Sequence, residues 1–132
     1  MRVVALDYGS ARTGVAVSDP TGTIARPLGV IERAGTDDGL ARVAKLIEEQ
    51  AAERVVVGLP LTLRGERGAQ AQETEAFVEA LRAAVEVPVE SFDERFTTGL
   101  AASVGSDDAP EDARAAAHLL SSYLEWTSAG RG

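Results

Sequence analysis

Four acidic residues lie next to apolar segments in a pattern that could support phosphate chemistry. Asp7 ends the apolar run RVVAL, Asp93 and Glu94 follow the run VPVESF, and Asp112 lies near the start of the EDARAAAHLL segment. Clustered carboxylates repel one another and raise their own pKa values unless a cation neutralises them. Two divalent ions can stabilise the attacking and leaving oxygens of a phosphodiester. If the fold brings these side chains together, the sequence predicts metal-assisted hydrolysis.

The residue types that the chain lacks narrow the kind of metal it could bind. Its 132 residues include no cysteine and a single histidine, His118. Disulfides, thiolate metal sites, cysteine nucleophiles and multi-histidine zinc sites are therefore excluded. Any metal must be held by oxygen ligands, which Mg²⁺ and Mn²⁺ prefer.

The charge pattern limits how the chain could bind nucleic acid. Its formal net charge of −8 argues against broad, non-specific adhesion to a polyanion. Apart from Lys45, the 13 basic residues are arginines, whose guanidinium groups bind phosphate oxygens in pairs. A few selective phosphate contacts are therefore expected.

Apolar periodicity places the first acidic residue in a β-hairpin. The runs at 2–7 and 14–18 predict two strands joined by a glycine-containing turn. A third strand is expected at 24–32, and Pro27 restricts it to the edge of a sheet.

Helices and strands alternate in the rest of the chain. A helix capped by Thr36 or Asp37 leads into a strand at 53–61, whose continuous apolar run is typical of burial on both faces. The later elements are expected as a helix at 70–84, a strand at 87–92, a short helix near 97–104 capped by Thr97 or Thr98, and a last helix at 110–126 with Pro110 in its first position. This order predicts a mixed sheet flanked by helices in one domain.

Such a topology would bring the acidic residues to one edge of the sheet. Ligands usually bind where strands end together in an α/β sheet. Asp7, Gly58-Leu59-Pro60 and Asp93-Glu94-Arg95 each follow a predicted strand. We therefore expect these segments to converge.

The last helix is expected to carry Asp112 on its buried face. Asp112 shares a helical stripe with Ala115, Ala116, Leu119 and Tyr123. His118 falls on the other side, with Glu111, Arg114 and Glu125, and is expected to be a surface residue.

Asp7 and Asp112 could each have a purely structural role instead. An aspartate before a glycine, as at Asp7, is typical of a turn. A carboxylate in the first turn of a helix, as at Asp112, interacts favourably with the helix dipole. Position alone does not separate these roles from metal binding.

Four ordered segments together resemble one known family. They are ALDYGSARTGVAVSD, VVVGLPLTLRGERG, ESFDERFTT and EDARAAAHLLSSYLE. In this order and spacing they resemble the YqgF (RuvX) family over nearly the whole chain. The resemblance implies an RNase H-like α/β fold with a mixed five-stranded sheet flanked by helices. Members are described as Holliday-junction-resolvase-like proteins and as pre-16S rRNA nucleases.

The resemblance also assigns roles to the carboxylates. By this resemblance Asp7 is the metal ligand on the first strand, Glu94 the second ligand and Asp112 the third, holding Mg²⁺ or Mn²⁺. Spacing alone leaves open whether Asp93 or Glu94 faces the metal, so Asp93 remains a candidate catalytic residue. The implied reaction is hydrolysis by water attacking in line on a phosphodiester.

Glycines and arginines near these acids are the candidate substrate contacts. Gly9 and Gly14 would let a nucleic-acid backbone come close. Arg12, Arg64 and Arg95 are the expected phosphate contacts, from their chemistry and loop positions. In similar proteins the segment before the last helix is longer and rich in lysine and arginine, whereas here it is the short, acidic SVGSDDAPEDA.

The resemblance predicts a nuclease that processes the 5′ end of pre-16S rRNA, with two alternatives. One is a resolvase for Holliday junctions or other branched DNA, for which a homodimer would match the symmetry of the junction. The other is a non-catalytic protein that binds RNA or a ribosome-assembly partner, which the acidic segment favours. A D-x-G turn also occurs in actin-like and sugar-kinase ATPases of this fold, but those proteins bind ATP between two such domains.

The sequence predicts a cytoplasmic protein without a membrane segment. No apolar run approaches the roughly 18 residues of a membrane span, and MRVVALD lacks the apolar stretch of a signal peptide. The whole chain of 132 residues is expected to form one domain, with about 128–132 as a flexible tail.

Overall fold

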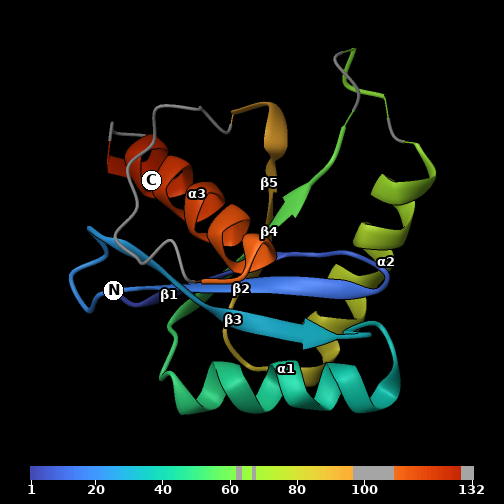
Figure 1. Cartoon of the computed structure of the whole chain (residues 1–132), viewed down its shortest axis with the longest axis horizontal. Helices are drawn as coiled ribbons and strands as arrows, with labels where there is room; N and C mark the ends of the chain where they lie inside the picture. Colours follow the sequence, from blue (N-terminus) through green and yellow to red (C-terminus); the bar gives the residue numbers. More distant parts are fainter. Residues whose placement is uncertain (62–63, 67, 97–108, 129–132) are drawn as a thin grey trace.

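The computed structural model describes residues 1–61, 64–66, 68–96 and 109–128. They form a five-stranded mixed sheet with helices on both faces (Figure 1). In chain order the elements are β1 (Val3–Asp7), β2 (Arg12–Ser18), β3 (Ala25–Glu32), α1 (Asp37–Glu49), β4 (Arg54–Leu59), α2 (Ala69–Ala84), β5 (Val89–Asp93), the short 3₁₀ helix η1 (Glu94–Phe96) and α3 (Glu111–Trp126).

The strand order β3-β2-β1-β4-β5 confirms most of the predicted topology. β1 pairs antiparallel with β2, β2 pairs antiparallel with β3, and the pairs β1–β4 and β4–β5 are parallel. β3, which contains Pro27, is an edge strand, as predicted. Since β1, β4 and β5 run in the same direction, their carboxyl ends share one edge of the sheet.

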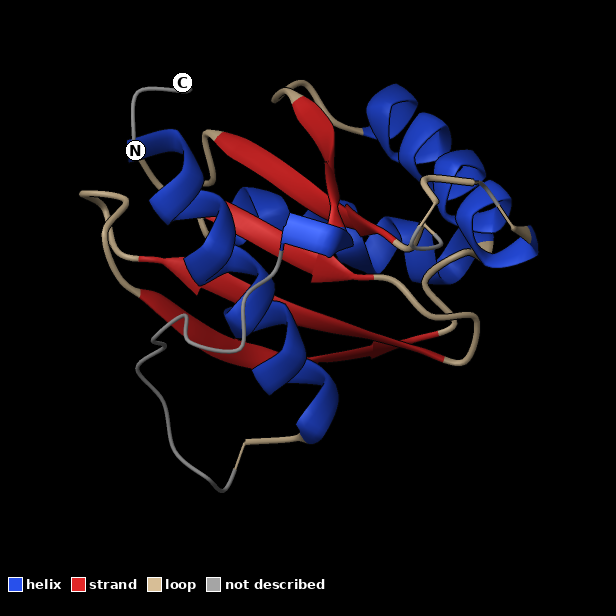
Figure 2. Ribbon diagram, turned by 90° about the horizontal axis from the view of Figure 1, so that it is seen from above, coloured by secondary structure: helices blue, strands red, loops and turns tan. Residues whose placement is uncertain are grey.

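Side chains of β1 alternate between two cores. Val4 and Leu6 belong to the core beneath α1 and α2, whereas Val3 and Ala5 belong to the core beneath α3. Figure 2 shows α3 lying across the strands on its own side of the sheet. Because successive residues of a strand point to opposite faces, Asp7 shares the α3 side with Val3 and Ala5.

Small residues let α3 lie close to the sheet. Ala5 and Ala16 of the strands pack against Ala116 and Ala117 of the helix. At Gly14 a Cβ atom would lie 1.8 Å from the carbonyl oxygen of Asp112. The first turn of α3 therefore touches the backbone of β2, which fixes where Asp112 lies.

The ends of two helices test the expected caps. Thr36 caps α1, as predicted, and its hydroxyl accepts a hydrogen bond of 3.1 Å from the Gly39 N–H. Pro110 is not the first residue of the last helix: with φ −56° and ψ 146° it is the extended N-cap residue, and Glu111 begins α3.

Two expectations fall on parts of the chain that are not described. The short helix predicted near 97–104 lies in the segment 97–108, outside the described residues. Most of the predicted tail, residues 129–132, lies outside them too. Within the described part, no helix has the length and apolar character needed to cross a membrane.

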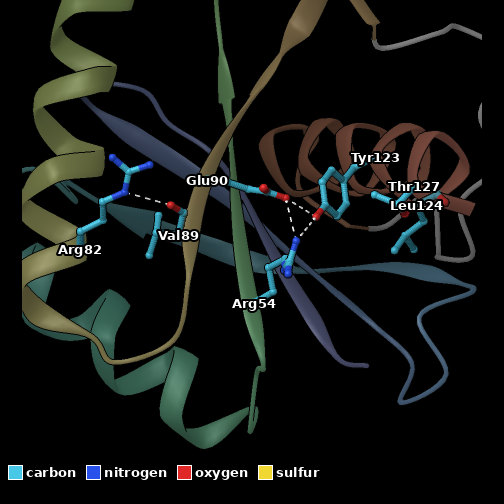
Figure 3. A network of polar contacts seen from close by, with 7 residues as sticks. All are labelled: Arg54, Arg82, Val89, Glu90, Tyr123, Leu124 and Thr127. Carbon is cyan, nitrogen blue, oxygen red and sulfur yellow. Dashed lines mark hydrogen bonds and ion pairs between the residues drawn. The ribbon is translucent and has the colours of Figure 1, made fainter. Parts of the chain in front are cut away.

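Polar contacts attach β5 to its neighbours from both faces (Figure 3). On the α3 side, the Arg54 Nη1 donates to Glu90 at 3.4 Å and to the Tyr123 hydroxyl at 3.2 Å, and that hydroxyl donates to Glu90. On the other side, the Arg82 Nε donates to the Val89 carbonyl at 2.9 Å. These contacts hold the strand that ends at Asp93 and leads directly into Glu94.

Candidate active site

Asp7 and Glu94 lie side by side at the carboxyl edge of the sheet. Asp7 is the last residue of β1 and Glu94 the first residue of η1, which follows β5. Both line a cavity of about 610 Å³ whose other wall is formed by α3. Gly58, near the end of β4, lies between them in the sheet and leaves room for the Glu94 side chain, since a Cβ there would lie 2.8 Å from Glu94 Oε1.

The carboxyls of Asp7 and Glu94 are hydrogen-bonded to each other, and the pKa of each is raised. Burial, with the nearby charges of Asp7 and Asp93, raises the pKa of Glu94 to about 7. Burial also raises the pKa of Asp7, although the hydrogen bond from Glu94 lowers it in part. Glu94 is therefore the carboxyl that is protonated first as the pH falls, and its O–H then donates the hydrogen bond to Asp7. Two desolvated carboxyls in contact are a site that a cation would stabilise.

We expect this pair to make the stability of the metal-free protein depend on pH. The Glu94 pKa rises from 4.5 to about 7 on folding, so the folded chain binds this proton more tightly than the unfolded chain. The resulting stabilisation is complete below pH 4.5 and is lost as the pH rises through about 7.

Urea unfolding in EDTA, from about pH 5 to about pH 8, measures this dependence. At each pH the free energy of unfolding of Glu94→Gln is subtracted from that of the wild type. This difference should fall as the pH rises across the range. A difference that does not change with pH would show that Glu94 holds no extra proton in the folded state.

Asp112 lies near this pair but faces another partner. Its charge contributes to the raised pKa of Asp7, yet its Oδ2 lies 3.3 Å from the Nε of Arg12. In the part of the chain that the structure describes, no group of three acidic or histidine side chains has the geometry to hold a metal ion. The structure thus brings together two of the three predicted ligands and pairs the third with an arginine.

The choice between Asp93 and Glu94 is decided by how the chain turns after β5. The Asp93 carboxylate pairs with Arg95, whose Nη2 lies 2.5 Å from Oδ2, and this arginine lowers the Asp93 pKa. Glu94, one residue later, turns towards Asp7 instead. Glu94 is therefore the residue positioned to act with Asp7, and Asp93 holds Arg95.

The two predicted substrate glycines serve the fold. A Cβ at Gly9 would lie 2.5 Å from the carbonyl oxygen of Arg12, so this glycine closes the turn between β1 and β2. Gly14 is buried beneath Asp112, with its Cβ position occupied by that residue's backbone. The space that the absent side chain leaves at Gly14 is filled by α3, and a contact of Gly14 with a nucleic-acid backbone stays a prediction.

The three predicted phosphate-binding arginines are not part of the described lining of the cavity. Arg12 pairs with Asp112, and Arg95 pairs with Asp93. Arg64 is exposed in the connection between β4 and α2. None of the three is among the described residues that line the cavity with Asp7 and Glu94.

The residues of α3 that line the cavity were not predicted from the sequence as part of the site. Glu111, Arg114 and His118 line it together with Asp7 and Glu94. His118 was expected at the surface because it lies off the apolar stripe, yet it is partly buried. The sequence does contain a pattern that could have indicated this wall. Glu111, Arg114 and His118 follow one another at i, i+3 and i+7, so they form a second helical stripe beside the one that carries Asp112.

Comparison with known proteins places this architecture in a family. Residues 1–126 match the family described as "RuvX: Holliday junction resolvase". A protein of Desulforudis audaxviator named "Putative pre-16S rRNA nuclease" is 39% identical over 139 residues, which cover 99% of each chain. This chain belongs to the RuvX family.

Other relatives share parts of the sequence or the fold alone. A Chloroflexus aurantiacus protein with the same name is 47% identical over 96 residues, which cover 73% of this RuvX chain but only 63% of that relative. RuvC of T. thermophilus, solved with a Holliday junction substrate, superposes with a TM-score of 0.73 over 98% of this chain and 96% of RuvC. At 18% identity this match confirms the predicted RNase H-like fold.

The chemistry of the cavity in this RuvX protein suits a hard divalent cation. Asp7 and Glu94 offer carboxylate oxygens, which are the ligands that Mg²⁺ and Mn²⁺ prefer. Their raised pKa values, caused by burial and mutual repulsion, mark a place where positive charge is favourable. The Arg12–Asp112 pair is substantially exposed, with 64% and 37% of the two side chains accessible, and such pairs are weak. The ion pair with Arg12 therefore does little to hold the Asp112 side chain in place.

We expect Gly58→Ala to weaken divalent-ion binding while the fold persists. The new Cβ would lie 2.8 Å from Glu94 Oε1 and 3.1 Å from its Cγ, so the flexible Glu94 side chain has to move. A misplacement of about 1 Å in a catalytic group can cost about 100-fold in rate. We expect the Mn²⁺ affinity, measured by calorimetry, to fall about tenfold or more.

Gly29→Ala is the matched control, because nothing lies within 4 Å of the added Cβ. Equal Mn²⁺ affinities in the two alanine variants would contradict a metal-binding role for Glu94 at this place.

Proposed function

We propose that this protein is a metal-dependent nuclease that hydrolyses phosphodiesters in structured nucleic acid, with the 5′ end of pre-16S rRNA as its substrate. The observation that carries the proposal is the hydrogen-bonded Asp7–Glu94 pair in a cavity at the carboxyl edge of an RNase H-like sheet. The names of relatives such as the Desulforudis protein support the rRNA substrate. Such processing would take place in the cytoplasm, as expected from the sequence.

The proposed roles of the acids follow from their positions. Asp7 and Glu94 would hold Mg²⁺ or Mn²⁺, with Asp112 as a third ligand once it leaves Arg12. When bound, the cation would act as a Lewis acid and stabilise the charge that develops on the phosphoryl oxygens. Arg12, released from Asp112, would be free to contact a phosphate of the substrate, and Asp93 would keep Arg95 at the rim of the site.

A second candidate substrate is a Holliday junction or another branched DNA. The similarity of fold to RuvC and the description of the family favour it. Symmetric cleavage of a junction needs two active sites, so this alternative requires a homodimer, whereas cleavage of a single RNA strand does not.

A panel of substrates distinguishes these functions. Precursor 16S rRNA, junction DNA, duplexes and single strands are incubated with Mn²⁺ or Mg²⁺, and the products are resolved by gel electrophoresis. We expect metal-dependent cleavage near the 5′ end of the mature rRNA. Preferred cleavage of the junction would replace the rRNA proposal, and binding without cleavage of any substrate would indicate the non-catalytic alternative.

A further inference from the structure

The wall of the cavity that faces the acid pair carries two side chains able to bind an anion. Arg114 and His118 belong to α3 and line the same cavity as Asp7 and Glu94. They are four residues apart, so their Cβ atoms lie about 6 Å apart on one face of the helix. Both side chains therefore leave α3 from the same side, on the wall of this cavity.

Arg114 is the basic residue in a described cavity lining that is otherwise acidic. The other charged residues in the described lining are the acids Asp7, Glu94 and Glu111. A nucleic-acid strand is itself an anion, so it needs a cation to enter such a cavity. Among the described residues the Arg114 guanidinium makes no ion pair or hydrogen bond, whereas Arg12 and Arg95 are paired with aspartates.

The stability of α3 does not explain an arginine at this position. Arg114 is the fourth residue of the helix, which begins at Glu111, and a cation near a helix N-terminus interacts unfavourably with the helix dipole. Its side chain is exposed and buries no apolar surface in the core. A cation at this place is better explained by a ligand.

We propose that Arg114 and His118 form a phosphate-binding subsite that holds the substrate strand against the Asp7–Glu94 pair. The guanidinium group can bind two non-bridging oxygens of one phosphate, and a ring N–H of His118 can donate to the same phosphate or to its neighbour. This subsite rests on the proposed nuclease function and names the residues that receive the strand. It adds a phosphate contact inside the cavity to those that the sequence assigned to Arg12, Arg64 and Arg95.

Binding without metal tests the subsite apart from catalysis. A fluorescent RNA hairpin with a single-stranded 5′ extension is titrated with protein in EDTA at several salt concentrations, and anisotropy gives the dissociation constant. We expect Arg114→Ala to raise the Kd about tenfold and to reduce the slope of log K against log salt by about 0.7–0.9, as for one lost phosphate contact. Arg114→Lys should keep the slope, because the charge remains, and His118→Gln should weaken binding two- to fivefold.

Arg26→Ala is the matched control for charge. Arg26 is exposed on β3 and pairs with Val17, near the opposite end of β2 from Arg12. Its removal lowers the net charge by the same amount as Arg114→Ala, and we expect the Kd and the slope to stay close to wild type.

The subsite is overturned if Arg114→Ala and Arg26→Ala give the same Kd and slope, or if the wild type does not bind the hairpin. A fall in the melting temperature of Arg114→Ala that Arg114→Lys does not share would show a structural role instead. The nuclease proposal fails separately, if the wild type binds with the predicted Arg114 dependence but cleaves nothing with Mn²⁺.

Discussion

Asp7→Asn is expected to reduce cleavage about a thousand-fold or more while nucleic-acid binding stays close to wild type. Asp7 lies in the cavity with Glu94 and provides the charge that would hold a cation there. Loss of a charged ligand removes several kcal/mol of stabilisation of the transition state, and each 1.4 kcal/mol is a factor of ten in rate. Asparagine keeps the size of the side chain, so the shape of the cavity is preserved.

The same substitution has an expected effect on stability that a simple folding defect would not produce. The charge of Asp7 is one cause of the raised pKa of Glu94, so removing it relieves repulsion inside the cavity. In EDTA, the free energy of unfolding of Asp7→Asn should therefore equal or exceed that of the wild type. Added Mn²⁺ should stabilise the wild type and have little effect on the variant.

Asp38→Asn is the control, because Asp38 is exposed in the first turn of α1. It should retain cleavage and the stabilisation by Mn²⁺. Cleavage by Asp7→Asn within tenfold of the wild type would remove Asp7 from the proposed metal site.

Gly14→Ala is expected to destabilise the protein by about 3 kcal/mol or more. The added methyl group would lie 1.8 Å from the Asp112 carbonyl oxygen and 2.4 Å from its carbonyl carbon. Both atoms belong to the backbone, so the first turn of α3 has to move away from β2. Overpacking a close contact typically costs 1–3 kcal/mol, and a clash with backbone on both sides is at the upper end of this range.

Urea unfolding of Gly14→Ala beside Gly29→Ala separates the clash from the general effect of adding a methyl group to a strand. A Cβ at Gly29 meets nothing within 4 Å, and alanine is usually more stable than glycine in a strand by about 0.5–1 kcal/mol. Gly29→Ala should therefore be neutral or slightly stabilising. Similar free energies of unfolding for the two variants would show that α3 does not rest on Gly14.

Features set by neighbouring residues were predicted correctly. The hairpin, the edge position of the strand with Pro27 and the Thr36 cap depend on the local chain, and the structure confirms them. The convergence of Asp7 and Glu94 followed from the strand order, because strands that run parallel end at the same edge.

Features set by contacts between distant residues were not predictable in this way. His118 lies off the apolar stripe, but the start of α3 extends over the cavity at the sheet edge, so the polar side of the helix faces Asp7 and Glu94. Gly14 was assigned to the substrate because nothing in the local pattern shows that a helix about 100 residues later packs on it.

The sequence by itself determined the order of the elements, the oxygen-only character of any metal site and the family, since these depend on residue types and their spacing. Only the tertiary structure decided which acids meet. Asp93 and Glu94 differ by only one residue in their spacing to every other motif, so spacing could not separate them. The η1 turn does separate them: Asp93 pairs with Arg95 and Glu94 meets Asp7. Asp112 likewise pairs with Arg12 because Gly14 lets α3 rest on β2.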